Sequence, residues 1–145
     1  MQPIDENSND KQHQYTMIFL HGLGDTAEGM MELFTENGWN PGWVPESCRI
    51  VLPTAPLKQV NLNDGMKMNS WFNVYRTLRK KGARSTNLGR IRKNYNQEEL
   101  KEAAEQLNEL ILEEQKKLPD QDASRIFIGG FSQGCMVSLA TLLSH

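Results

Sequence analysis

The strongest constraint on this chain is the pentapeptide Gly130-Phe131-Ser132-Gln133-Gly134. It stands between a β-prone run at residues 125–128 and an apolar stretch at 135–143 that predicts a helix. A Gly-x-Ser-x-Gly motif at a strand-to-helix junction is typical of a nucleophile elbow, a turn so tight that side chains at its glycine positions would clash. The sequence therefore predicts Ser132 on a strained, exposed turn, and the alternative is a glycine-rich turn with an incidental serine.

Strands and helices alternate along the chain, which predicts an α/β fold with a mostly parallel sheet and flanking helices. Strands are expected at residues 15–20, 49–52 and 125–128. Helices are expected after Asp25, which can act as a cap, after Asn96, which has capping-box spacing with Glu99, and after the pentapeptide. Residues 54–73 predict a long irregular loop. The polar residues 1–14 predict a flexible tail, so the 145 residues allow one domain, at 15–145.

Charge and cysteine content narrow the class of protein. Sixteen basic and 18 acidic residues give a net charge of −2, which argues against a nucleic-acid partner. The two cysteines, Cys48 and Cys135, form neither a disulfide framework nor a zinc cluster, and this fits a reducing compartment. The most apolar stretch, 135–143, is too short to cross a bilayer. We therefore expect a cytoplasmic protein without a metal site.

A serine nucleophile needs hydrogen-bond donors for the oxyanion that forms when it attacks a carbonyl group. The backbone N–H of Gln133 lies at the start of the predicted helix and is one such donor. The second is expected from the loop after an earlier strand, a place that residues 21–25 (HGLGD) occupy. Leu23 would supply that N–H. The alternative is a simple turn that ends the strand, with Asp25 as a helix cap.

Three segments together resemble the acyl-protein thioesterase and carboxylesterase family of α/β-hydrolases. They are FLHGLGDTAEG, PTAPLKQVNLNDGMKMNSWFN and IFIGGFSQG, in the family's order, and the resemblance covers residues 15–145 apart from a basic segment. It implies the α/β-hydrolase fold and hydrolysis of fatty-acyl thioesters on proteins, of lysophospholipids and of small esters, without metal or organic cofactor. It also implies Ser132 as nucleophile, an oxyanion hole of the Leu23 and Gln133 N–H groups, Gly130 and Gly134 as elbow glycines, and an acyl-chain groove bordered by Met66, Met68 and Trp71.

The same chemistry needs a histidine base and an acid that orients it. In α/β-hydrolases both follow the serine, yet after Ser132 the chain has no Asp or Glu and only His145. A helix over 133–144 would place His145 about 18 Å from the elbow. His13 and His21 are the other histidines. The resemblance places the family's Asp and His, and its final strands, in a C-terminal portion. We therefore expect a partial α/β-hydrolase domain, truncated after the elbow helix.

A basic segment at residues 76–96 departs from the family pattern, and no acid occurs between Asp64 and Glu98. It is interpreted as a solvated surface insertion or lid segment, or as a contact for anionic membrane from Arg76 to Lys93. Two functions stay open. One is a serine hydrolase of the acyl-protein thioesterase type whose Asp and His lie in sequence absent here, so that this chain alone is inactive or nearly so, or is completed in trans by its missing half or a partner subunit. The other is a non-catalytic, truncated product that binds acyl chains, a partner or anionic membrane. The sequence does not define an oligomeric state.

Overall fold

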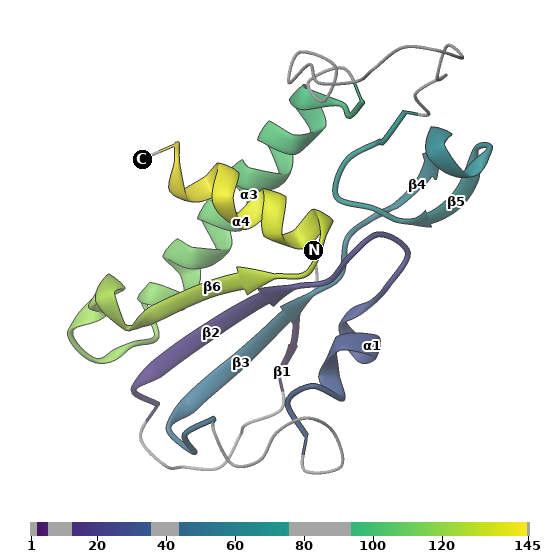
Figure 1. Ribbon diagram of the computed structural model, residues 1–145. Coiled ribbons are helices and arrows are strands. Elements are labelled where there is room, and N and C mark those ends of the chain that lie inside the picture. Colours follow the sequence, from purple (N-terminus) through teal and green to yellow (C-terminus); the bar gives the residue numbers. More distant parts are fainter. Residues whose placement is uncertain (1–2, 6–12, 36–43, 76–93, 145) are drawn as a thin grey trace, which may run out of the picture.

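The structure is a computed structural model that describes residues 3–5, 13–35, 44–75 and 94–144. Its main sheet has the strand order β1-β3-β2-β6 (Figure 1). These strands are β1 (Pro3–Asp5), β2 (Tyr15–Leu20), β3 (Cys48–Pro53) and β6 (Ile126–Gly130). β2 pairs in parallel with β3 and β6, and β1 pairs antiparallel to β3. The predicted mostly parallel sheet is confirmed, whereas the predicted tail at residues 1–14 contains an edge strand.

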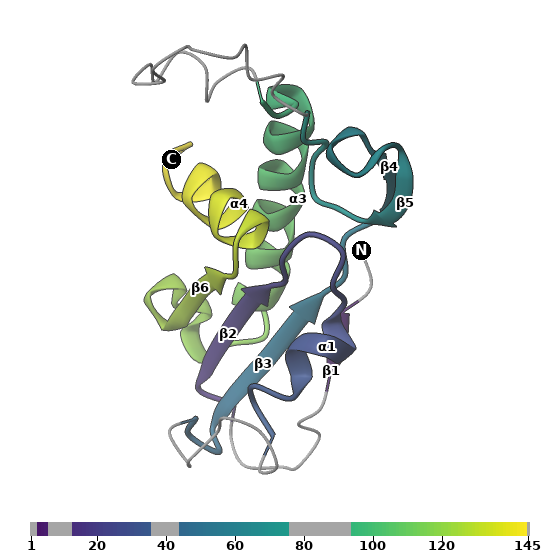
Figure 2. The same ribbon diagram turned by 45° about the vertical axis from the view of Figure 1, so that its right-hand side comes forward.

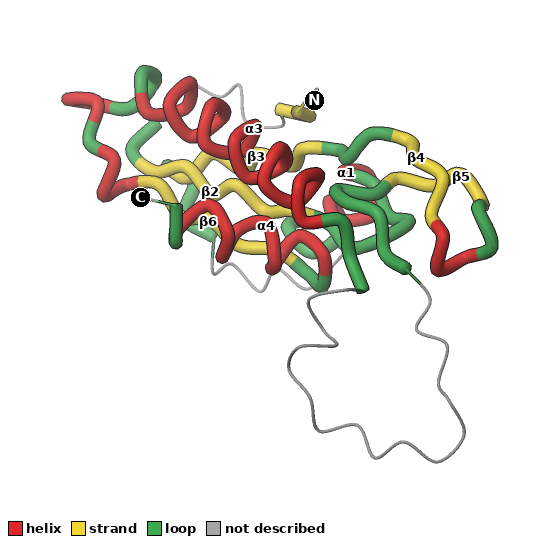
Figure 3. The backbone as a smooth tube through the Cα atoms, turned by 90° about the horizontal axis from the view of Figure 1, so that it is seen from above, coloured by secondary structure: helices red, strands yellow, loops and turns green. Residues whose placement is uncertain are grey.

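Helices cover both faces of this sheet, because β2 alternates its apolar side chains between them. Ile18 and Leu20 belong to the larger core, together with residues of α3 (Gln97–Gln115) and α4 (Gln133–Leu142). Phe19 belongs to a smaller core with α1 (Ala27–Met31) on the opposite face. Figure 2 shows α1 in front of β3 and α3 behind the sheet, and Figure 3 shows α3 and α4 together along one face.

The predicted start of α3 is confirmed, with Asn96 as its N-cap. The Asn96 side chain accepts hydrogen bonds from the N–H groups of Glu98 and Glu99, at 3.1 and 3.2 Å. The reciprocal half of the predicted capping box is absent, because the Glu99 carboxylate instead accepts from the N–H of Asn73 at 2.6 Å. It also pairs with Lys58 at 3.4 Å. This carboxylate therefore ties α3 to a segment well outside the helix.

The predicted cap of the first helix is wrong by one residue. Thr26 is the N-cap of α1, and its hydroxyl accepts from the N–H of Gly29 at 3.2 Å. Asp25 instead accepts from the N–H of Thr26 at 2.8 Å. Asp25 thus orders the turn that leads into the helix.

The loop predicted at residues 54–73 contains a second, two-stranded sheet. β4 (Leu57–Val60) and β5 (Met66–Asn69) pair antiparallel, with a 3₁₀ helix (Asn61–Asn63) between them. Four of the eight strand side chains are exposed and only Val60 is buried, so the hairpin lacks the apolar alternation that would have revealed it. It projects beside the carboxyl ends of the main strands (Figure 1). Residues 76–93 of the basic segment lie outside the described residues.

Candidate active site

The turn between β6 and α4 has the geometry of a nucleophile elbow. Ser132 has φ 52° and ψ −111°, a strained conformation for a residue with a side chain. A Cβ on Gly130 would lie 2.4 Å from the carbonyl carbon of Gly134, and a Cβ on Gly134 would lie 2.2 Å from the Leu20 carbonyl oxygen. Both glycines are therefore required by close backbone contacts. In the described part of the chain, the exposed Ser132 hydroxyl has no hydrogen-bond partner.

The loop after β2 passes directly over this elbow. A Cβ on Gly22 would lie 3.5 Å from Cβ of Ser132, and the N–H of Phe131 donates to the Leu20 carbonyl at 2.9 Å. Leu23 follows in this loop, and Gln133 is the first residue of α4. Within the described residues, the backbone N–H groups of Leu23 and Gln133 donate to no protein acceptor. Two free donors thus lie on the two segments that meet at Ser132.

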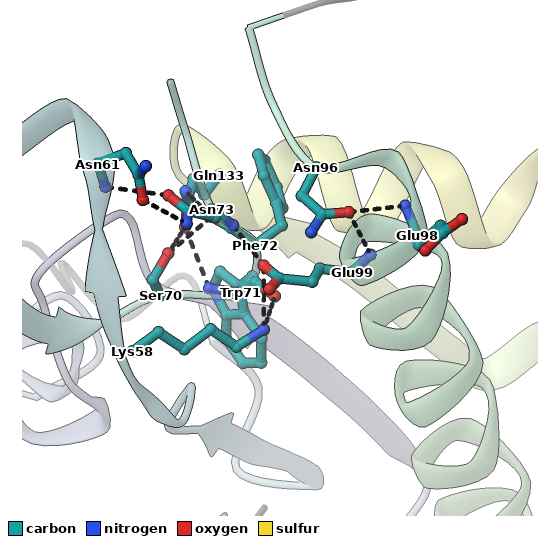
Figure 4. A network of polar contacts seen from close by, with 10 residues as sticks. All are labelled: Lys58, Asn61, Ser70, Trp71, Phe72, Asn73, Asn96, Glu98, Glu99 and Gln133. Atoms are coloured by element: carbon teal, nitrogen blue, oxygen red, sulfur yellow. Dashed lines mark hydrogen bonds and ion pairs between the residues drawn. The ribbon is translucent and has the colours of Figure 1, made fainter. Parts of the chain in front are cut away.

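The Gln133 side chain turns inward and holds residues 70–72 beneath the elbow (Figure 4). Its Oε1 accepts from the backbone N–H of Trp71 at 3.1 Å and lies 3.2 Å from the Ser70 hydroxyl. Its Nε2 donates to the Phe72 carbonyl at 2.8 Å. The motif predicts a role only for the backbone N–H of Gln133. Nothing in the chain order signals this contact, which joins residues more than sixty positions apart.

Trp71 lies in the core, which corrects its predicted place at the border of an acyl groove. It is 1% exposed, its indole N–H donates to the His21 carbonyl at 2.8 Å, and its ring centroid lies 5.1 Å from that of His21. Met68 is half-buried, and its sulfur would lie 3.7 Å from a Cβ on Gly24. Met66 is exposed on the hairpin. The groove role of the two methionines stays a prediction.

His21 is wrong as an alternative base, because both of its ring nitrogens are occupied. Nε2 accepts from the N–H of Ala55 at 2.9 Å, so it carries no proton. Nδ1 must then be the protonated nitrogen, and it donates to the Gly22 carbonyl at 2.6 Å. The ring is fully buried, and no lone pair is left to take a proton from Ser132. Its role is to shape the loop that precedes Leu23.

His13 does not complete the site either. His13 bonds to Thr16 at 2.8 Å near the start of β2, about 20 Å along the strand direction from the elbow. His145 lies outside the described residues. Among residues 13–35, 44–75 and 94–144, no histidine is therefore placed to serve as the base. What the described residues do supply is the serine and two backbone donors.

Of the two free cysteines, Cys135 is exposed in the first turn of α4, whereas Cys48 lies away from the elbow. Cys48 is buried at the start of β3, at the opposite end of the sheet, and burial raises the pKa of its thiol. The described residues contain no group of three or more His, Cys, Asp or Glu that could hold a metal ion. Likewise, no helix in the described part of the chain has the length and apolar character needed to cross a membrane.

Sequence comparison links the chain to known hydrolases. A family model described as phospholipase/carboxylesterase matches residues 6–145. Acyl-protein thioesterase 1 of Yarrowia lipolytica is 39% identical over 129 residues, which are 89% of this chain and 50% of that protein. Acyl-protein thioesterase 1 of Schizosaccharomyces pombe is also 39% identical, over 92% of this chain and 51% of its own length. The chain thus spans about half the length of the curated relatives it matches.

Solved structures show the same fold. SOBER1 of Arabidopsis thaliana superposes with a TM-score of 0.62 and 25% identity, over 90% of this chain and 55% of that one. Acyl-protein thioesterase 2 of Zea mays superposes with a TM-score of 0.64 and 21% identity, over 97% and 50%. The second likeness supports the fold alone. Together they confirm the α/β-hydrolase architecture predicted from the sequence.

Proposed function

Because the chain belongs to the phospholipase/carboxylesterase family of α/β-hydrolases, we propose that it carries the nucleophile of a serine hydrolase. The proposed substrates are fatty-acyl (palmitoyl) thioesters on proteins. The observation that carries this proposal is the elbow itself: an exposed serine at φ 52°, with two unengaged backbone N–H groups on the adjoining segments. A serine that only filled a turn would have no need of that strain.

In the proposed reaction, Oγ of Ser132 attacks the acyl carbonyl carbon. The carbonyl oxygen becomes an oxyanion, which accepts hydrogen bonds from the N–H groups of Leu23 and Gln133. The carbon–sulfur bond then breaks, the cysteine thiolate leaves and takes up a proton, and the acyl group remains on Ser132. Water hydrolyses this ester. The proton that Ser132 loses goes to a histidine base oriented by an acid, neither of which the described residues supply.

The two fungal relatives support the proposed substrate class, because both are named acyl-protein thioesterase 1. The half-buried Met68 offers a flexible apolar side chain beside the Gly24 loop, and Met66 offers another that is exposed on the hairpin; such side chains suit an alkyl chain. Lysophospholipids and other carboxylic esters are proposed as related substrates. The proposed compartment is the cytoplasm, in line with the low cysteine content. A membrane contact through Arg76 to Lys93 would fall on residues outside the described part.

A second function is supported by the lack of a suitably placed histidine among the described residues. A chain that cannot activate Ser132 could still bind acyl groups or a protein partner, and exposed apolar side chains on α4 would serve this role. These side chains are Met136, Leu139, Leu142 and Leu143. In this alternative the elbow is an inherited feature without turnover, and Ser132 reacts no faster than any other exposed serine.

Labelling with a fluorophosphonate probe separates the two functions, since such probes require an activated serine. The 145-residue chain, Ser132→Ala and the control Ser144→Ala are incubated with the probe and digested for mass spectrometry. Catalysis by this polypeptide predicts an adduct on Ser132 that is lost in Ser132→Ala and retained in Ser144→Ala, which removes an exposed serine just beyond the end of α4; the base would then come from outside the described residues. A wild-type chain that is folded by circular dichroism yet forms no adduct would contradict catalysis by this polypeptide and favour the binding function.

A further inference from the structure

We infer that residues 70–72 are a positioning element for both donors of the proposed oxyanion hole, acting through Trp71 and the Gln133 side chain. The inference rests on the proposed function, because it concerns the two N–H groups of that site. It adds residues that take no part in the chemistry themselves. They fix the spacing between two donors that belong to different elements of the fold.

The need for such an element follows from the geometry of oxyanion stabilisation. Both N–H groups must reach one oxygen atom, each at a nitrogen–oxygen distance of roughly 2.7–3.1 Å. A misplacement of about 1 Å can lower the rate about a hundredfold. Leu23 lies in a loop after β2, whereas Gln133 starts α4, so local backbone geometry alone does not set their separation. Something must hold the loop and the helix start in register.

Trp71 contacts both parts directly. On one side, its backbone N–H donates to the Gln133 side chain at 3.1 Å. On the other side, its indole N–H donates to the His21 carbonyl at 2.8 Å, two residues before Leu23. Its ring also packs against the His21 ring, with centroids 5.1 Å apart. A single buried residue, through its backbone N–H and its indole N–H, therefore bridges the loop that carries one donor and the residue that carries the other.

The bridge has one hydrogen-bonding arrangement, because its groups are buried and mutually satisfied. Ser70, Trp71, Phe72 and His21 are each at most 1% exposed, and Gln133 is 5% exposed. Among the described residues, no buried side-chain nitrogen or oxygen lacks a hydrogen-bond partner. The amide nitrogen and oxygen of Gln133 cannot exchange places without leaving the backbone N–H of Trp71 unpaired. Such a network resists displacement.

The bridge is also anchored from outside, which distinguishes it from a freely packed core segment. Lys58 of β4 donates to the Trp71 carbonyl at 3.2 Å. Asn73 donates its backbone N–H to Glu99, and its carbonyl accepts from the N–H of Asn96 at 2.8 Å (Figure 4). The segment is thus tied to the hairpin and to the start of α3. These contacts hold its backbone still while Trp71 reaches the elbow.

Two variants test the inference with little change in shape. Gln133→Met keeps the backbone N–H but removes the side-chain hydrogen bonds, and Trp71→Phe removes the indole N–H. The control is Thr141→Val, which removes a buried hydroxyl that donates to the carbonyls of Val137 and Ala104, at 3.0 and 3.3 Å, between α4 and α3. We expect the rate of fluorophosphonate labelling at Ser132 to fall about tenfold to a hundredfold in both variants. Thr141→Val should stay within about twofold of the wild-type rate.

Circular dichroism and the urea midpoint establish that each variant is folded before its rate is compared. Folded Gln133→Met and Trp71→Phe chains that label at the wild-type rate would overturn the inference. The same holds if Thr141→Val loses as much rate as they do, because the effect would then be general destabilisation rather than positioning.

A second readout does not depend on a reactive serine. The amide resonance of Leu23, followed by ¹H–¹⁵N NMR, should move in Gln133→Met and stay unchanged in Thr141→Val. If the wild-type chain is not labelled but this resonance moves, the proposed function fails and the positioning role stands. If the resonance does not move in Gln133→Met, the positioning role is wrong, whatever the labelling shows.

Discussion

Two regions flank Ser132, and they are built on opposite principles. The closed side consists of His21, residues 70–72 and Gln133, which are buried and linked by hydrogen bonds from three parts of the chain. The open side consists of exposed apolar side chains on β6, the elbow and α4. These are Phe127, Phe131, Met136, Leu139, Leu142 and Leu143, with exposed fractions from 37 to 85%. No charged residue occurs between positions 126 and 144.

The difference shows which part of the proposed hydrolysis the described residues can support by themselves. Buried polar groups are tolerated only when their hydrogen bonds are complete, and on the closed side they are complete. This side carries the donors that would stabilise charge on a substrate carbonyl. The exposed side chains of the open side are apolar and need no hydrogen-bond partners. An apolar surface of this kind marks an interaction site. No histidine described in the structure reaches Ser132 from either side.

The largest effect is expected at the elbow itself, where the backbones of α4 and β2 come into close contact. Gly134→Ala would place a Cβ 2.2 Å from the Leu20 carbonyl oxygen, so β2 and α4 must separate. We expect a loss of about 3 kcal/mol in the free energy of unfolding by urea, together with loss of Ser132 labelling. Gly129→Ala is the matched control, because its Cβ would meet only the edge of the Phe19 ring, at 3.1 Å. Equal losses in the two variants would contradict a special role for the elbow.

A smaller effect is expected from removing one hydrogen bond of the closed side. Ser70→Ala removes a buried hydroxyl that donates to the Phe72 carbonyl at 2.7 Å. That carbonyl keeps its second bond, from Gln133, so we expect a loss of about 1 kcal/mol in urea unfolding. Ser144→Ala, at an exposed hydroxyl, should stay within about 0.5 kcal/mol of wild type. A Ser70→Ala chain as stable as wild type would show that the closed side does not depend on this network.

The smallest effect on stability is expected on the open side. Leu139→Lys and Leu142→Lys place charges on exposed positions of α4 and should change the free energy of unfolding by less than about 0.5 kcal/mol each. Fluorescence of the apolar dye ANS bound to the chain should nevertheless fall, because the apolar patch is interrupted. Val137→Lys, at a fully buried position of the same helix, is the contrasting control and should unfold the chain. Unchanged ANS fluorescence would mean that the dye reports another surface.

Much of the architecture could be predicted because its signals are local. Residues 15–20 form the predicted strand, and Asn96 caps the predicted helix. The elbow between β6 and α4 follows from a motif of five residues, since its close contacts arise within the turn and from the adjacent strand. The hairpin at 57–69 escaped prediction because Val60 is the single buried side chain of its two strands, and β1 because a three-residue edge strand carries no periodic pattern.

By itself, the sequence determined the order of strands and helices, the position of Ser132 and the family to which the chain belongs. Only the tertiary structure decided that Trp71 supports the elbow from within the core and that His21 has no lone pair left to act as a base. Only the tertiary structure decided, too, that the Glu99 carboxylate accepts a hydrogen bond from the N–H of Asn73 rather than from the N–H of Asn96, the cap of its own helix. The physical reason is range: turns and caps are set by neighbours within about four residues, whereas these hydrogen bonds join residues 26 to 62 positions apart.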